Sequence, residues 1–229
     1  VWIFTLQLPW ELGADFFLRN LLDGDAASNT LAWRWVAGLH TKNKTYLATA
    51  SNIRKCSSER FTDPCDHSLG LKRLATTTQP QQENLSPGAL QNTPIEWPKP
   101  VSCLLGENTV SALLVTEDDL STQIPFQPST TAALSASPRS PIAPTNELVR
   151  QFSANAIEDT LQRLAEETSA HVVEQAMSEE EIVAWAVEQK VEQLFHPYAP
   201  SGPTQMRLRN LAPKLAAKGI RLTAFMRDY

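Results

Sequence analysis

The sequence predicts a mixed fold, in which a helical N-terminal segment is followed by a proline-rich linker and a small α/β domain. Large apolar side chains recur at helical spacing in the first 40 residues. Beyond residue 100, short apolar runs alternate with longer amphipathic patterns. This alternation favours a parallel sheet with helices on both faces, which is a three-layer α/β arrangement.

Prolines mark the expected boundaries between these parts. The chain has 16 prolines and 8 glycines, and the prolines gather in two stretches that cannot bury a core. We therefore expect an all-α segment at 1–75, a flexible linker at 76–100, and an α/β domain at 101–229 with a Pro/Ser-rich insertion at 123–145.

The N-terminal segment predicts two helices joined by a short turn. Val1–Leu8 is apolar enough to form a buried helix or strand. Glu11–Leu22 carries apolar residues one helical turn apart, and an Asp-Gly-Asp turn ends that helix. The second aspartate of the turn, Asp25, can cap another helix at Ala26–Gly38.

The α/β domain is expected to contain three helices, at Asn146–Ser169, Ser178–Lys190 and 203–218. Ser178 and Glu181 form the pattern of a capping box, and a proline opens the third helix. In the first helix we expect one apolar side, formed by Leu148, Phe152, Ala156, Leu161 and Leu164. Four short apolar runs predict buried strands, at Val101–Leu105, Ala112–Val115, Val191–Tyr198 and Ile220–Met226.

Charge divides the chain unevenly. The formal net charge is −5, with +2 in residues 1–75 and −6 in residues 101–229. Nucleic acid would favour the first segment, and the acidic segment would repel a phosphate backbone. At that end of the chain, a protein partner or a small ligand is the better expectation.

Compartment and completeness can also be judged from the sequence. There is no run of about 18 apolar residues, and a basic segment before an apolar stretch is missing at the start, so we expect a cytoplasmic protein without a membrane span. The chain begins Val-Trp-Ile-Phe without a methionine. We interpret this apolar start as a cut inside a larger helical domain, which would leave this fragment inactive by itself.

The most informative segment is residues 23–38, Asp-Gly-Asp-Ala-Ala-Ser-Asn-Thr-Leu-Ala-Trp-Arg-Trp-Val-Ala-Gly. Together with Leu8–Phe17, Lys44–Leu47 and the Asn52-Ile53 pair, it resembles the C-terminal part of the FAD-binding domain of the cryptochrome/DNA photolyase family. The resemblance covers about residues 1–62. The α/β region after it looks similar to a bacterial branch of photolyase-like proteins.

The resemblance implies roles for residues at the flavin. Asp23 and Asp25 match the aspartates on the polar side of the FAD ring, and Asn29 matches the asparagine that sets the protonation of flavin N5. Trp33 matches the proximal electron donor to the excited flavin, and Trp10 matches the second member of that relay. The groups that hold the FAD diphosphate would lie before this segment.

The last implied residue concerns the substrate. Trp35 matches the tryptophan that stacks on the damaged base. Stacking of an aromatic ring on an extruded base contributes about 1–3 kcal/mol. The resemblance thus implies a carbon–carbon lyase that uses blue light to split pyrimidine dimers in damaged DNA.

Other functions fit parts of the same pattern. A cryptochrome-like photoreceptor would use the same tryptophans and signal to a protein partner through the acidic C-terminal domain. A third interpretation is a non-catalytic α/β scaffold beside a degenerate flavin domain.

Each residue of the motif also has a structural interpretation when it is taken alone. The Asp-Gly-Asp run is more often only a turn and a helix cap, and Trp33 and Trp35 are more often core or surface aromatics. Asn29 alone is an ordinary helix-surface residue. The sequence indicates no particular antenna chromophore.

The remaining polar candidates are weak. The four histidines, His40, His67, His171 and His196, lack metal-ligand spacing and a paired nucleophile. Cys56 and Cys65 with His67 lack a fourth ligand, and Cys103 is expected in the core, so we predict no metal site. Pro200–Pro203 lacks the glycines and lysine of a phosphate loop, and Glu179–Glu181 is expected to be a solvated helix start.

Overall fold

The structure, a computed structural model, describes residues 1–40, 45–58, 60, 97–100, 104 and 109–227. The chain divides into two compact units. The first comprises Val1–Arg19 and Gly24–Thr93, and the second comprises Asn20–Asp23 and Pro94–Tyr229. Of the expected linker at 76–100, only residues 97–100 lie within the described part. There, Pro100 forms a bridge to Met226, and the ring of Trp97 contacts that of Tyr198, with centroids 5.6 Å apart.

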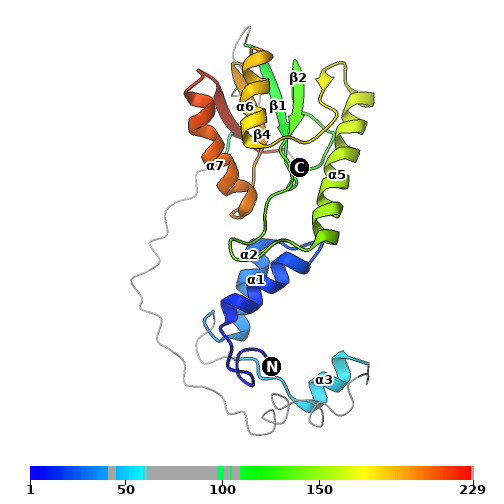
Figure 1. Cartoon of the computed structure of the whole chain (residues 1–229), viewed down its shortest axis with the longest axis vertical. Coiled ribbons are helices and arrows are strands. Elements are labelled where there is room, and N and C mark those ends of the chain that lie inside the picture. The colour runs from blue at the N-terminus through cyan, green and yellow to red at the C-terminus, as the bar shows by residue number, and fades with distance from the viewer. Residues whose placement is uncertain (41–44, 59, 61–96, 101–103, 105–108, 228–229) are drawn as a thin grey trace. The chain divides into compact units, whose positions relative to one another are not determined.

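The N-terminal unit is helical in its described residues. Its helices are α1 (Trp10–Asn20), α2 (Ala26–Val36) and α3 (Ala50–Cys56) (Figure 1). The side chain of Asp25 accepts a hydrogen bond from the Ser28 N–H at 2.6 Å, which confirms the predicted cap of α2. Thr49 caps α3 in the same manner, since its hydroxyl accepts from the Asn52 N–H at 3.2 Å.

The first eight residues differ from the prediction. Val1–Leu8 forms a single turn rather than a buried helix or strand: the N–H groups of Thr5 and Leu6 both donate to the Val1 carbonyl. Gln7 has a φ of 56°, which ends the turn. Nucleating a helix is costly, and Pro9 leaves too few residues before α1 to compensate for that cost.

The second unit is built on a five-stranded sheet. Its strands are β1 (Ser111–Val115), β2 (Thr130–Ala133), β3 (His171–Val172), β4 (Gln193–Pro197) and β5 (Arg221–Phe225). They lie in the order β3-β2-β1-β4-β5, and every described pair is parallel. The predicted parallel α/β arrangement is therefore confirmed, and the structure places β1 at the centre of the sheet.

Helices cover this sheet. The helices are α5 (Glu147–Glu167), α6 (Glu179–Glu188) and α7 (Pro203–Ala216), seen around the strands in Figure 1. Every residue of β1, β2 and β4 is buried, as expected for parallel strands covered on both faces. Because the crossovers through α5 and α6 run in opposite directions across the sheet, the right-handed rule places α5 on one face and α6 with α7 on the other.

Two strands were missed by the sequence patterns. The stretch at 123–145, expected to be only an insertion, contains β2, which pairs directly with the central strand. Its residues are small and lie between prolines, so they lack the apolar run that predicts a buried strand. β3 has only two residues. The predicted strand Val101–Leu105 lies outside the described residues, except for Leu104, which is in a turn.

The three helices of this unit match their predicted positions, and the capping box of Ser178 and Glu181 is present. The expected apolar side of α5 is wrong in its first turns. Leu148 and Phe152 are 71% and 53% exposed. The buried stripe is shifted by one residue, because it passes through Val149, Ser153, Ile157, Thr160, Leu161 and Leu164.

Candidate functional site

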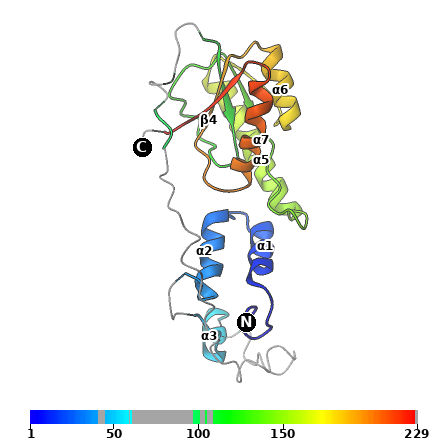
Figure 2. The ribbon, with the colours of Figure 1, turned by 90° about the vertical axis from the view of Figure 1, so that its left-hand side faces the viewer.

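The resemblance motif forms the contact between α1 and α2, which run side by side (Figure 2). Asn29 and Trp33 are one turn apart on α2, and both are half-buried. The Nδ2 of Asn29 donates to the Ala14 carbonyl of α1 at 2.8 Å. The structure therefore brings the predicted flavin-tuning amide and the predicted electron donor onto one face of α2.

The ring of Trp33 packs closely against the backbone of α1. A Cβ atom added at Gly13 would lie 2.2 Å from the ring atom Cη2 of Trp33, so only glycine leaves room for the indole. The ring also meets Phe17 edge-on, with centroids 5.2 Å apart. Trp33 is thus held in a defined position by a glycine and an aromatic ring of α1.

The aromatic neighbours of Trp33 include a residue that the sequence did not single out. Trp2 lies edge-on to Trp33, with ring centroids 6.3 Å apart and planes at 81°. Its indole N–H donates to the Pro9 carbonyl at 2.8 Å, which fixes the ring. Trp10 is half-buried at the start of α1, and among the described ring contacts it does not appear as a partner of Trp33. The apolar start of the chain was the signal that could have pointed to Trp2.

The two predicted aspartates are accessible to solvent. Asp23 and Asp25 are both exposed, in the turn between α1 and α2. Asp25 uses one carboxylate oxygen to cap α2, which confirms the prediction that this residue is a helix cap. Carboxylates at a helix N-terminus are stabilised by the helix dipole, whether or not they also contact a ligand.

Trp35 points away from Trp33, because side chains two positions apart in a helix are separated by about 200° around its axis. It is 44% exposed, and its ring lies 5.8 Å from that of Tyr46 with planes at 32°. The hydroxyl of Tyr46 accepts a hydrogen bond from Asn52 Nδ2 at 2.7 Å. Trp35 and Tyr46 therefore form an exposed, tilted aromatic pair.

The final glycine of the motif ends α2. Gly38 has a φ of 80°, which favours glycine. Its N–H donates to the Trp35 carbonyl at 3.1 Å, and the Leu39 N–H donates to the Arg34 carbonyl at 2.9 Å. These two bonds form a Schellman motif, so the Ala-Gly end of the motif has a structural role.

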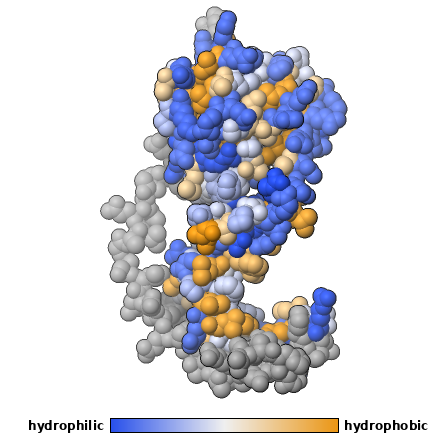
Figure 3. Space-filling view, in the orientation of Figure 1, coloured by the Kyte–Doolittle hydropathy of each residue, from blue (hydrophilic) through white to orange (hydrophobic). Residues whose placement is uncertain are grey.

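A flavin ring needs apolar cover and hydrogen-bonding groups at its pyrimidine edge. The helix pair offers both kinds of group. Figure 3 shows hydrophobic patches on the N-terminal unit, and the exposed large apolar residues of α1 and α2 are Leu12, Phe16, Phe17, Leu31 and Trp35. With the carboxylates of the turn and the amide of Asn29, this donor and acceptor set fits the ring of FAD.

Those of the other candidate residues that the structure describes show no catalytic arrangement. His196 is buried in β4, where burial lowers the pKa of its imidazole and a hydrogen bond to the Pro197 carbonyl opposes that shift. Cys56 is exposed, whereas Cys65, His67 and Cys103 lie outside the described residues. Gly202 precedes α7 without a side-chain cap. Glu179 is not merely solvated, because it pairs with Arg207 of α7 at 2.7 Å.

The described residues contain neither a metal-binding cluster nor a membrane-spanning helix. No group of three or more His, Cys, Asp or Glu side chains there is placed to hold a metal ion. None of the helices in the described ranges is both long and apolar enough to cross a membrane.

Comparisons with known proteins concern the N-terminal unit. Residues 2–67 match the family model described as the FAD binding domain of DNA photolyase. A deoxyribodipyrimidine photo-lyase of Streptomyces griseus is 50% identical over 40 residues, which are 18% of this chain and 9% of that protein. One of Buchnera aphidicola subsp. Baizongia pistaciae (strain Bp) is 37% identical over 43 residues, which are 19% of this chain and 9% of that protein.

The family match at residues 2–67 contains the whole motif that forms the α1–α2 contact. The N-terminal region of this chain is thus similar to the FAD-binding domain of the DNA photolyase family. FAD is the cofactor of that domain. The chain spans about a tenth of the length of the curated relatives that it matches. No solved structure matches the chain.

Proposed function

We propose that this chain is part of a photolyase-like flavoprotein that repairs pyrimidine dimers in DNA with blue light. The observation that carries the proposal is the family match at residues 2–67, whose Asn29 and Trp33 are held on one face of α2. Bound FAD would supply light absorption and the transferable electron. The residues of the chain would hold the ring, tune it and renew its electron.

Asn29 is suited to the tuning role by its own hydrogen bond. Its Nδ2 already donates to the Ala14 carbonyl. An amide bonded through its nitrogen presents Oδ1 as an acceptor, which is the atom that could receive a proton donor such as a reduced flavin N–H. Asp23 and Asp25 would contact the polar side of the ring, where their exposed position leaves them accessible.

Trp33 would be the immediate electron donor, with Trp10 as the second member of the relay. The edge contact of Trp2 with Trp33 supports Trp2 as a further candidate for that second position. Steady illumination of the FAD-loaded protein with a reductant measures this relay. We expect Trp33→Phe to slow flavin photoreduction strongly, because a phenyl ring is far harder to oxidise than an indole.

Comparison of Trp2→Phe and Trp10→Phe assigns the second position. Trp97→Phe, a tryptophan of the other unit, is the matched control and should leave the photoreduction rate unchanged. If Trp33→Phe is reduced by light as fast as the wild type, the proposed role of Trp33 is wrong.

Trp35 supports repair over signalling. Its exposed ring, backed by Tyr46, can stack on an extruded base, and such stacking contributes about 1–3 kcal/mol. Trp35→Ala should therefore weaken binding of dimer-containing DNA by about 5- to 150-fold. Binding of the variant at wild-type strength would remove this role.

A cryptochrome-like photoreceptor is the second candidate, and the acidic C-terminal unit favours it. That unit carries most of the negative charge, with a net −6 in residues 101–229, so it suits a protein partner better than DNA. Blue-light illumination with dimer-containing DNA distinguishes the two: loss of dimers supports repair, and a flavin protein without repair supports the photoreceptor. A non-catalytic scaffold would bind no flavin. In each case we place the protein in the cytoplasm.

A further inference from the structure

The open edge of the sheet at β3 is flanked by two grooves. One, of about 640 Å³, lies between α5 and residues 172–175. The other, of about 610 Å³, extends from the same residues to Met177 and Glu181. Val172, Val173, Glu174 and Gln175 line both grooves, so this segment is a wall common to both.

The backbone at this edge has hydrogen-bonding groups available to a partner. The Val173 N–H donates to the Thr131 carbonyl of β2 at 3.0 Å, and Val172 stands opposite Thr131 in the parallel register. In such a ladder the bonds inward are made by the residues on either side of the one in register. The N–H and C=O of Val172 therefore face away from β2, toward the open edge.

Both grooves are acidic. The first is lined by Glu158, Asp159 and Glu174, and the second by Glu174 and Glu181. Neither groove is lined by a lysine or arginine among the described residues, and Asp159 is the one carboxylate of the four paired with an arginine, Arg163, at 2.9 Å.

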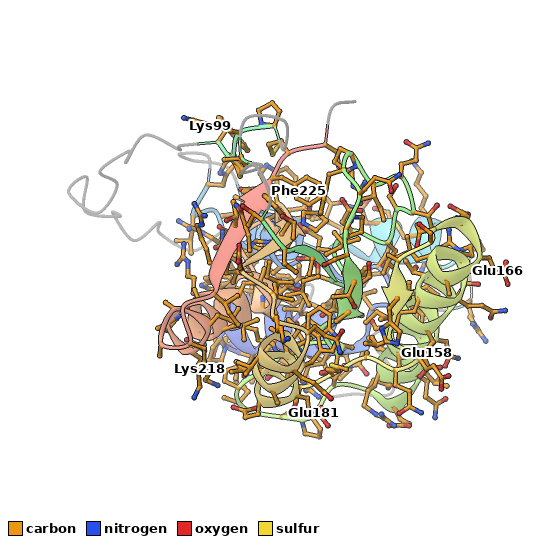
Figure 4. All side chains as sticks on the ribbon, turned by 90° about the horizontal axis from the view of Figure 1, so that it is seen from above. Lys99, Glu158, Glu166, Glu181, Lys218 and Phe225 are labelled. Carbon is orange, nitrogen blue, oxygen red and sulfur yellow. The ribbon has the colours of Figure 1, made fainter. Side chains whose placement is uncertain are left out.

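The labelled side chains of Figure 4 agree with this distribution of charge. In Figure 4, the labelled side chains of Glu158, Glu166 and Glu181 lie along the border of the unit formed by α5 and α6, whereas Lys99 and Lys218 lie toward the other edge of the sheet. The surface over α5 is predominantly hydrophilic in Figure 3.

We propose that the β3 edge of the α/β unit docks an extended, lysine- or arginine-rich segment of a partner protein. A strand laid along Val172 would form main-chain hydrogen bonds there, and its side chains would point alternately into the two grooves. Cationic side chains match the carboxylates of both grooves. This inference adds a binding site to the second candidate function, the cryptochrome-like photoreceptor. It rests on that function only because both require a protein partner.

Fluorescence anisotropy of a labelled hexalysine peptide, which presents cationic side chains to both grooves, tests the proposal, with the full chain in the dark and without added flavin. We expect binding that weakens with salt, and no binding of the hexaglutamate counterpart. The double variant Glu158→Gln/Glu174→Gln should lower the affinity by roughly tenfold. The double variant Glu188→Gln/Glu192→Gln changes the net charge equally, lines neither groove, and should bind like the wild type.

A second pair of variants tests the backbone. Val172→Pro removes the outward N–H without breaking the ladder to β2, and should also weaken binding, whereas Val172→Thr keeps the N–H and should not. Circular dichroism confirms that each variant is folded. Equal affinity of the wild type and Glu158→Gln/Glu174→Gln, or an equal loss in Glu188→Gln/Glu192→Gln, would overturn the proposal. Because no flavin is involved, failure here is distinct from failure of the light-driven function.

Discussion

At the scale of single residues, Gly13 and Trp33 depend on each other. In an exposed helix, replacing glycine by alanine is ordinarily favourable by about 0.5–1 kcal/mol. At this position the added methyl would meet the indole at 2.2 Å, so overpacking should instead cost about 1–3 kcal/mol. We expect Gly13→Ala to destabilise the protein in denaturant unfolding followed by tryptophan fluorescence.

A double-mutant cycle isolates the cause. In a Trp33→Leu background, the smaller side chain should remove most of the penalty of Gly13→Ala. If Gly13→Ala costs the same in both backgrounds, the close packing of these two residues is not its origin.

A second residue-scale prediction concerns pH. Burial lowers the pKa of His196 in the folded protein, while its value in the unfolded chain is about 6.5. Below about pH 6.5 the unfolded chain binds a proton that the folded chain does not. The free energy of unfolding should therefore decrease as the pH is lowered from about 6.5 to the pKa of His196 in the folded protein. His196→Gln should flatten this dependence.

Unfolding free energies between about pH 7.5 and 5.5 measure the effect. His171→Gln is the control for the loss of an imidazole, because His171 is exposed in β3. A wild-type protein whose stability varies with pH no more than that of His196→Gln would contradict the assignment.

At the scale of the secondary-structure elements, Asp25 combines two possible roles that can be separated. Its side chain caps α2, and loss of such a cap typically costs about 1 kcal/mol. Asp25→Ala should therefore destabilise α2, whereas Asp25→Asn should keep the cap and lose only the charge. If the carboxylate also contacts FAD, both variants should weaken FAD binding in a fluorescence titration.

The outcome for Asp25→Asn decides between these roles. Wild-type FAD affinity in this variant would assign Asp25 to capping alone. Asp23→Asn serves as the comparison for the loss of one exposed carboxylate, because Asp23 lies in the same turn and the N-cap of α2 is Asp25.

Local signals explain what could be predicted at this scale. α2, α6 and α7 follow from short-range chemistry: a cap at Asp25, a capping box at Ser178 and a proline at the first position of α7. β2 could not be predicted in this manner. Its Thr-Thr-Ala-Ala residues are buried because neighbouring strands and helices cover them, and no short-range pattern encodes that.

Only part of the candidate site could be predicted, because only part of it depends on local sequence patterns. The spacing of Asn29 and Trp33 on one helix face is a local property, and the structure places both against α1. The contact of Trp2 with Trp33 joins residues 31 positions apart across a turn, which periodicity does not reveal. The buried stripe of α5 likewise depends on how the helix rotates onto the sheet, so Leu148 and Phe152 were assigned to the wrong side.

At the scale of the whole molecule, the two units differ in charge and in chemistry. The helical unit carries the family motif and the aromatic cluster, and the α/β unit carries an acidic sheet edge with two grooves. We infer that light chemistry belongs to the first unit and partner binding to the second. Variants at the β3 edge should therefore leave flavin photoreduction unchanged.

The flavin content of the protein expressed from its complete gene tests the central claim most directly. The protein should be purified in the dark and its absorption spectrum recorded before and after denaturation releases the chromophore. The account predicts the spectrum of bound FAD at about one equivalent per chain, lost or reduced in an Asn29→Ala variant that remains folded. Protein that is purified without flavin, and that takes up none when FAD is titrated in, would contradict it.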